Sequence, residues 1–173
     1  MDVDLDFLLI QKMRLGEAQA LEEFVKKYYP RILKYCRAHV RDAADAEDLT
    51  QETFVHFFRT LKQYRHYGKA VNYLYVIAAN VCRDDYRKKK EIPMGELPER
   101  PDQSAERLEE RLTVRMALEQ LPDDLKETAV LYFLQECKQK DIARILGISL
   151  PLVKYRIRRA RKQLSAFFGE EER

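Results

Sequence analysis

The apolar residues of this chain recur at intervals of three and four, and over no stretch do they alternate cleanly with polar residues. Such spacing puts apolar side chains on one face of an α-helix, whereas a half-buried strand needs a period of two. The 173 residues also include only five glycines and six prolines, which argues against a turn-rich β-sandwich or barrel. The sequence therefore predicts an all-α protein.

One segment interrupts the helical pattern. Residues 91–110 read EIPMGELPERPDQSAERLEE and hold three of the six prolines, with seven acidic residues against two arginines. Proline lacks a backbone donor and disfavours helix at the residue before it. We predict a flexible acidic linker at 91–104 that joins two small helical domains, 1–90 and 105–173. An ordinary solvated loop is equally compatible with these residues.

The periodicity also predicts individual helices, the second of which is interrupted or kinked near Pro30. The predicted helices cover residues 4–15, 17–41, 43–63, 70–90, 105–120, 123–136, 138–146 and 150–168.

Composition and termini exclude several classes of protein. No apolar run approaches the roughly 18 residues of a membrane span. The first residues, MDVDLDFLLIQKM, are acidic where a signal peptide is basic. We expect a soluble protein of the cytoplasm with no membrane insertion.

The three cysteines are Cys36, Cys82 and Cys137. They are far apart and do not form the paired ligand motif of a structural zinc site. We expect thiols in a reducing compartment, no metal and no cofactor, and a redox role for the thiols stays an open alternative.

The segment KDIARILGISLPLVKYRIRRARKQL, residues 140–164, has the features of a helix-turn-helix. Gly147 stands where a helix end often needs a left-handed residue. Ser149 can cap the next helix, and Pro151 lies in its first turn, where a missing donor does no harm. The second helix buries a stripe spaced by four, three and four residues, which comprises Val153, Ile157, Ala160 and Leu164.

The same second helix is rich in cations outside this stripe. Six of the nine residues from Lys154 to Lys162 are Lys or Arg, and none is acidic. A helix fits the DNA major groove, where Arg can pair with guanine and Lys or Arg can neutralise phosphates. We predict DNA binding, against the alternative of a solvated basic surface.

The N-terminal half contains a helix of opposite charge, DAADAEDLTQETFVHFFRTL, at residues 42–61. Asp45, Asp48 and Glu52 are spaced three and four residues apart, so their charges repel one another. Such a face suits a cationic partner. Favourable interaction of the first acids with the helix dipole explains part of the pattern equally well.

The following segment, residues 63–90, combines tyrosines with an amide and cations. Bases of single-stranded nucleic acid stack on aromatic rings, and an amide can read base edges. We predict such a surface here, while expecting most of the individual tyrosines to be core residues.

In this order, the motifs resemble the group 4, or extracytoplasmic-function, sigma factors of bacterial RNA polymerase over about residues 5–166. DAEDLTQETF resembles region 2.2 of that family. NYLYVIAANVCRDDYRKKK resembles regions 2.3 and 2.4, whose pattern is W-L-x-x-I-A-x-N-x-x-x-D-x-x-R. LPDDLKETAVLYFLQECKQKDIARILGISLPLVKYRIRRARKQL resembles regions 4.1 and 4.2.

The resemblance implies a protein without catalytic residues that binds core RNA polymerase and directs initiation at promoters. The residues implied to meet the β′ clamp helices are Asp48, Leu49, Gln51 and Glu52. Those implied to act at the −10 element are Tyr67, Gly68, Lys69, Tyr73, Asn80, Arg83 and Arg87. At the −35 element they are Lys154, Tyr155, Arg158 and Arg159, with Arg156 and Arg161 nearer the phosphates.

Two departures from the family pattern stand out. Tyr73 occupies the usual Trp position and keeps a stacking ring. Pro151–Leu152 replaces a common Gly–Thr, which removes a hydroxyl that could contact a phosphate or cap the helix.

The resemblance further implies contact with the β-subunit flap and control by an anti-sigma factor. Two rival interpretations remain: a helix-turn-helix DNA-binding regulator without polymerase association, and a helical adaptor that binds only protein.

Overall fold

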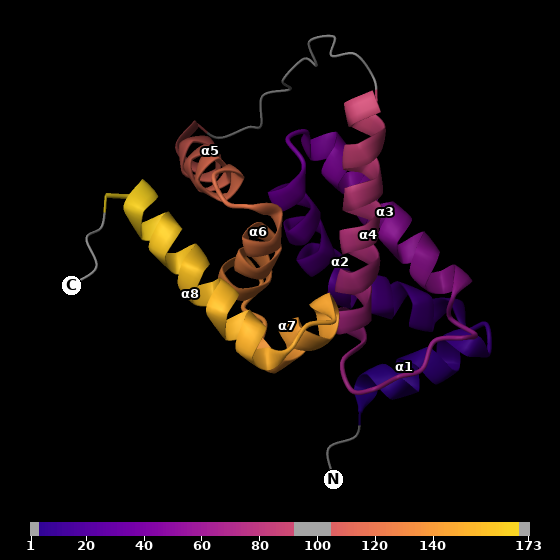
Figure 1. Cartoon of the computed structure of the whole chain (residues 1–173). Coiled ribbons are helices and arrows are strands. Elements are labelled where there is room, and N and C mark those ends of the chain that lie inside the picture. The colour runs from indigo at the N-terminus through magenta and orange to yellow at the C-terminus, as the bar shows by residue number, and fades with distance from the viewer. Residues whose placement is uncertain (1–3, 92–104, 170–173) are drawn as a thin grey trace. The chain divides into compact units, whose positions relative to one another are not determined.

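The computed structural model of the chain describes residues 4–91 and 105–169. Every regular element in these two ranges is helical, which confirms the predicted all-α class (Figure 1). The elements are α1 (Leu5–Arg14), α2 (Ala18–His39), α3 (Ala43–Arg59), α4 (Ala70–Glu91), α5 (Ala105–Glu119), α6 (Asp123–Ala129), the π-helix η1 (Val130–Leu134), α7 (Gln139–Leu146) and α8 (Leu150–Phe167).

Three predicted helices differ in detail. The third ends at Arg59, not near residue 63, because Thr60 caps it and a turn follows in which the Tyr64 amide donates to the Thr60 carbonyl. The sixth turns into the wider η1, in which the Gln135 amide donates to the Val130 carbonyl five residues back. The second predicted helix is not interrupted, since α2 runs through Pro30 as one element.

The chain divides into two compact units, Met1–Leu97 and Pro98–Arg173. Of the linker predicted at 91–104, Glu91 is the last residue of α4, and residues 92–104 lie outside the described ranges. None of the helices within the described ranges combines the length and the apolar character that a membrane crossing requires.

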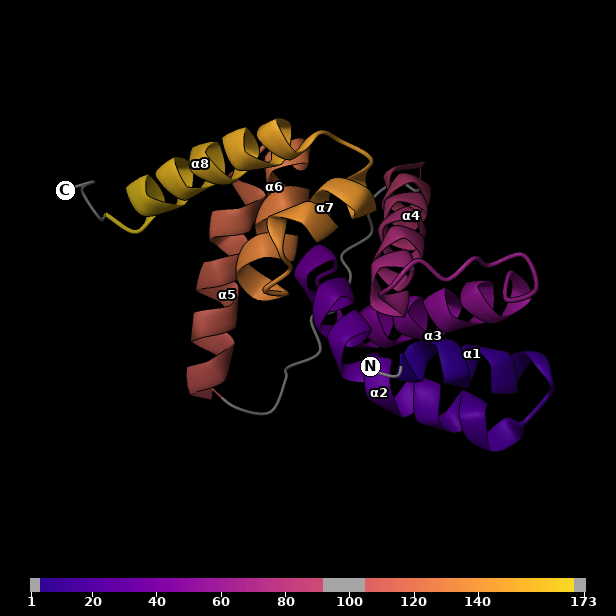
Figure 2. The ribbon, with the colours of Figure 1, turned by 90° about the horizontal axis from the view of Figure 1, so that it is seen from below.

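In the first unit, α2, α3 and α4 pack against one another (Figure 2). Aromatic side chains lie in the core between them. Phe24 of α2 stacks on Phe57 of α3 with ring centroids 4.8 Å apart. Leu74, Ile77, Ala78 and Val81, whose spacing puts them on one face of α4, are all buried. This core holds the outer faces of α3 and α4 in place.

A polar contact fastens α1 to α2 in the same unit. The buried carboxylate of Asp6 accepts hydrogen bonds from the Tyr28 hydroxyl and from the Lys27 ammonium, whose nitrogen lies 2.6 Å away. Burial and the adjacent Asp6 carboxylate raise the pKa of Tyr28 well above its ordinary value.

The second unit contains the predicted helix-turn-helix. Gly147 has left-handed φ and ψ of 64° and 36° at the end of α7. The Ser149 hydroxyl accepts from the Leu152 amide at the start of α8, so both predicted features of the turn are confirmed. Val153 and Ile157 of the apolar stripe are buried with Ala160, whereas Leu164 is half-buried.

Candidate nucleic-acid interface and acidic face

The recognition face of α8 consists of Lys154, Tyr155, Arg158 and Arg159, all of which are exposed. This face lies away from the buried stripe of α8. The helix can therefore pack on the rest of the second unit through the stripe while it presents these four side chains to solvent. The Tyr155 ring is 50% exposed, and the Arg159 guanidinium carbon lies 5.8 Å from its centroid. Arg159 Nη1 lies 3.4 Å from the Tyr155 hydroxyl, and this contact orients the Arg159 guanidinium.

Two other predicted DNA-contacting residues of α8 have protein partners. Arg156 is half-buried, and its Nε lies 3.4 Å from Asp124 Oδ2 of α6. Arg161 is exposed and lies over the Phe133 ring of η1 at 5.7 Å. Arg156 therefore contributes to the packing of α8 on α6, and its contact with DNA phosphates stays a prediction.

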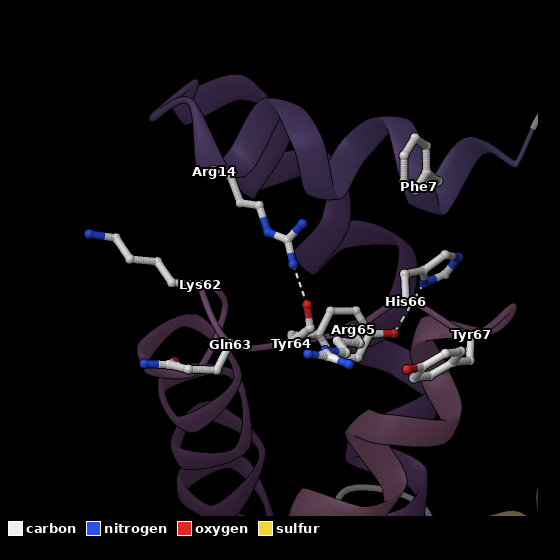
Figure 3. Close-up of a pocket in the computed structure, with 8 residues that line it drawn as sticks. All are labelled: Phe7, Arg14, Lys62, Gln63, Tyr64, Arg65, His66 and Tyr67. Atoms are coloured by element: carbon white, nitrogen blue, oxygen red, sulfur yellow. Dashed lines mark hydrogen bonds between the residues drawn. The ribbon is translucent and has the colours of Figure 1, made fainter.

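In the first unit, the aromatic loop, residues 61–69, connects α3 to α4 and is tied to α1. Arg14 of α1 donates from Nε to the Leu61 carbonyl over 3.1 Å and from Nη2 to the Tyr64 carbonyl (Figure 3). These two bonds satisfy loop carbonyls that no helix pairs, so α1 fixes the conformation of the loop.

A second tie joins the loop to the start of α1. His66 Nε2 lies 2.6 Å from Asp4 Oδ2, and His66 Nδ1 lies 3.1 Å from the Tyr64 hydroxyl. The hydrogen bond from His66 lowers the pKa of the Asp4 carboxyl, whose other oxygen caps α1. Burial and nearby carboxylates raise the pKa of Tyr64 to about 12, which keeps its hydroxyl protonated as a donor.

Between α1 and the loop lies an open pocket of about 660 Å³, lined by Phe7, Arg14 and residues 62–67 (Figure 3). Its lining combines aromatic rings with cations. Tyr67, at the end of this run, is 76% exposed, and Gly68 has a φ of 94°, a conformation that favours glycine. The predicted loop residues Tyr67, Gly68 and Lys69 are thus all at the surface.

Tyr73 is placed differently from Tyr67. Its ring stacks on Tyr64 at 4.9 Å and 24°, and its hydroxyl lies 3.3 Å from Thr60 Oγ1. The residue is half-buried. Tyr73 therefore packs against the aromatic loop on its inner side and is only partly exposed to solvent.

The α4 cationic face consists of Asn80, Arg83, Tyr86, Arg87 and Lys90, all exposed. Arg83 Nη1 donates to Asn80 Oδ1 over 3.1 Å, so the amide and the guanidinium are held together. The sequence analysis did not name Tyr86, which is 58% exposed with the Lys90 ammonium 4.9 Å from its ring centroid. Its spacing of three residues from Arg83 was the signal that could have identified it.

Lys89 lies beside this face, but its side chain forms ion pairs that link α4 to α3. Its ammonium donates to Asp45 of α3 and also pairs with Asp85 over 3.0 Å. Burial disfavours the charged amine, but the bonds to the two carboxylates outweigh it and raise the pKa of Lys89. Asp45, counted among the acids of the predicted acidic helix, is therefore engaged within the protein.

The acidic face of α3 consists of Asp48, Gln51, Glu52 and Val55, which share one side of the helix and are exposed. Leu49, which the family resemblance also assigns here, is only 5% exposed and packs in the core. Val55 is 45% exposed, and its position four residues after Gln51 marks an apolar spot that the sequence analysis missed. Glu52 lies 3.7 Å from His56 Nε2. The face thus offers two carboxylates around a small apolar patch.

In the ranges that the structure describes, no group of three or more His, Cys, Asp or Glu side chains is arranged to hold a metal ion.

Comparison with known proteins identifies both units. Residues 24–92 match Sigma-70 region 2, and residues 111–164 match Sigma-70, region 4. The first match contains α3, the aromatic loop and α4, and the second contains the helix-turn-helix.

Individual relatives agree with these matches. The ECF RNA polymerase sigma factor SigM of Bacillus subtilis is 30% identical over 156 residues, which cover 86% of this chain and 95% of that protein. The ECF RNA polymerase sigma factor SigE of Mycolicibacterium smegmatis is also 30% identical, over 86% of this chain, but this chain spans only 62% of its length.

Among solved structures, the fold resembles the sigma factor RpoE of Bartonella quintana in complex with the anti-sigma factor NepR. The TM-score is 0.72 at 20% identity, over 87% of this chain and 98% of that one. With both conserved regions matched in order and a full-length relative at 30% identity, this chain belongs to the extracytoplasmic-function RNA polymerase sigma factors of the sigma-70 family.

Proposed function

We propose that this sigma factor divides its work among three surfaces: the acidic face of α3 binds core polymerase, the aromatic loop and α4 cationic face engage the −10 element, and the recognition face of α8 reads the −35 element. As a sigma factor it is an initiation factor and not an enzyme, so the chemistry of RNA synthesis belongs to the polymerase.

The observation that carries the proposal is the recognition face. Four exposed side chains, three of them cationic, stand on one side of a helix that is held by a capped turn and a buried stripe. An α-helix enters the major groove, where a guanidinium can take both acceptors of guanine. Arg159, oriented by Tyr155, suits such a contact, and the surrounding cations suit phosphates.

The −10 surface suits a strand that has been opened. The exposed Tyr67 ring offers a stacking platform, and stacking offsets part of the few kcal/mol needed to unstack a base. Asn80 and Arg83 lie side by side on α4, where an amide can meet base edges and a cation can meet phosphate.

Two further partners follow from the same proposal. Region 4 would contact the β flap of the polymerase, and a sigma factor of this family would be regulated by an anti-sigma factor that covers its exposed surfaces. The complex of the Bartonella relative with NepR supports the second expectation. We place the activity in the cytoplasm, where bacterial polymerase works.

Charge reversal tests the polymerase contact. We expect Asp48→Arg with Glu52→Arg to abolish capture by core RNA polymerase, because four units of charge change on a face that we assign to a cationic partner. Glu109→Arg with Glu110→Arg, an equal change at exposed positions of the second unit, is the matched control. Normal capture of the α3 variant would refute the assignment of this face.

The −35 contact is tested on duplex DNA with wild-type and single-base-changed promoters. We expect Arg159→Ala to weaken binding by about 1–3 kcal/mol and to relax preference at one position, as loss of a base contact does. Lys162→Ala removes an equal charge from the same helix and should weaken all sequences alike. If Arg159→Ala also weakens all sequences alike, the residue contacts a phosphate instead.

Helix-turn-helix regulators that never bind polymerase need only the second unit. The match to Sigma-70 region 2 over residues 24–92 gives that alternative no support.

A further inference from the structure

Two thiols meet in the core of the first unit. Cys36 of α2 and Cys82 of α4 are 46 residues apart in the chain, yet their Sγ atoms lie 3.9 Å apart, with the Cys82 thiol donating to Cys36. Both are buried, at 0% and 5% exposure, and neither is in a disulfide. The packing of α2 against α4 therefore brings together two sulfurs that no local motif pairs.

Their surroundings favour a reactive sulfur at Cys36. The hydrogen bond from Cys82 stabilises the Cys36 thiolate and lowers the pKa of Cys36, although burial acts against it. A contact with Thr50 of α3 acts in the same direction as the Cys82 bond. The thiolate is the form of cysteine that attacks an oxidised sulfur.

We propose that Cys36 and Cys82 form a redox-sensitive thiol pair, which hydrogen peroxide converts into a disulfide that staples α2 to α4. In the first step the sulfur of Cys82, the more exposed residue of the two, attacks one peroxide oxygen, the O–O bond breaks, and sulfenic acid and water form. In the second step Cys36 attacks the Cys82 sulfur, the S–O bond breaks, and a second water leaves. The thiols lose two electrons and two protons, and the peroxide gains both.

The movement required is small. A disulfide has an S–S distance of about 2.05 Å, so the two sulfurs must close from 3.9 Å. Rotation about the side-chain bonds together with a slight approach of α2 and α4 can supply the difference. The bond would close a long loop of the unfolded chain, which favours the folded state.

Cys137 provides an internal control. It is buried in the second unit, where its thiol contacts the Gln135 carbonyl at 3.9 Å, and it is not in a disulfide. The same chain therefore carries a third buried thiol, in a different unit from Cys36 and Cys82, whose alkylation can be followed in the same sample.

The experiment treats the full chain with hydrogen peroxide, quenches it, and alkylates it under denaturing conditions before mass spectrometry. We expect Cys137 alone to be alkylated and a peptide cross-linked between Cys36 and Cys82, with a mass about 2 Da below the sum of its two peptides because two hydrogens are lost. Dithiothreitol should restore three alkylated thiols. Three alkylated thiols after oxidation, or irreversible oxygen addition at either sulfur, would overturn the proposal.

Variants locate the bond. Cys137→Ser should still form the cross-linked peptide, whereas Cys36→Ala and Cys82→Ala should not. The oxidised wild type should melt several degrees above the reduced protein, and this shift should vanish in both alanine variants. Peptide mapping of the wild type gives the answer even if an alanine variant fails to fold.

A consequence for transcription rests on the proposed function, because Cys82 lies within the segment of α4 that presents Asn80 and Arg83. We expect the oxidised protein to yield less run-off transcript from a cognate promoter and dithiothreitol to restore it. A reduced protein that directs no initiation would refute the proposed function. Equal transcript from both forms would refute only this consequence, since the disulfide itself is measured by mass.

Discussion

At the scale of single residues, Gly147 and Glu136 of the second unit share an unusual backbone conformation but not a side chain. Gly147, at the end of α7, has a φ of 64°, and Glu136, after η1, has a φ of 54°. Glycine adopts this region without penalty, whereas other L-residues lose about 1–2 kcal/mol. Glu136 is exposed and carries this strain because η1 ends on a wide turn.

Glu136→Gly is therefore expected to raise the free energy of unfolding of the second unit by about 1 kcal/mol, because it removes the steric strain. Gly147→Ala is the opposite case and should lower it by a similar amount, since no atom lies within 4 Å of an added Cβ and only the backbone is strained. Urea unfolding of the full chain, followed by helical circular dichroism, measures both. A destabilising Glu136→Gly would mean that the glutamate side chain stabilises the turn.

At the scale of helices, the most informative contact joins α8 to α6. Arg156 stands among the recognition-helix cations, yet its side chain is only 18% exposed and its charged end faces Asp124. Its Nε is buried and forms no hydrogen bond, although Asp124 Oδ2 lies 3.4 Å away. The pair therefore acts as a partly desolvated ionic contact that sets how α8 packs.

Arg156→Ala should lower the stability of the second unit by about 1–2 kcal/mol, since it removes both the buried stem and the ionic partner of Asp124. Arg158→Ala, an exposed cation two residues away, should leave stability within about 0.5 kcal/mol of wild type. A double-mutant cycle with Asp124→Asn isolates the pair, and the absence of coupling would contradict this view of Arg156.

At the scale of the whole molecule, Tyr28 and Tyr64 of the first unit have raised pKa values and hydroxyls in polar contacts with Asp6 and His66. The pKa of Tyr64 is raised to about 12 and that of Tyr28 is raised further, chiefly by burial. In the unfolded chain both hydroxyls have a pKa near 10. Their contribution to the free energy of unfolding is therefore complete below pH 10 and is lost as the pH rises through the pKa values of the folded protein.

The first unit should accordingly lose stability as the pH rises from about 10 to about 12. Thermal melts across this range, with ionisation followed by tyrosine absorbance, measure the effect. Tyr64→Phe should make the decline shallower, because one group that resists ionisation is gone. A decline that is unchanged by this substitution would exclude Tyr64 as a cause.

The sequence by itself determined the helical class, the capped turn at Gly147 and Ser149, the apolar stripes, and the opposite charges of α3 and α8. Each of these depends on residues within a few positions of one another, and helical periodicity reports which face is buried. That is why Val153 and Ile157 were correctly predicted to be buried.

Only the tertiary structure decided which members of those patterns are available to a partner. Leu49 and Arg156 share helices with exposed site residues but face neighbouring helices, and Tyr73 stacks on Tyr64. The meeting of Cys36 and Cys82 depends on how α2 packs against α4. Periodicity states that a face is covered, but the element that covers it is fixed by contacts between residues far apart in the chain.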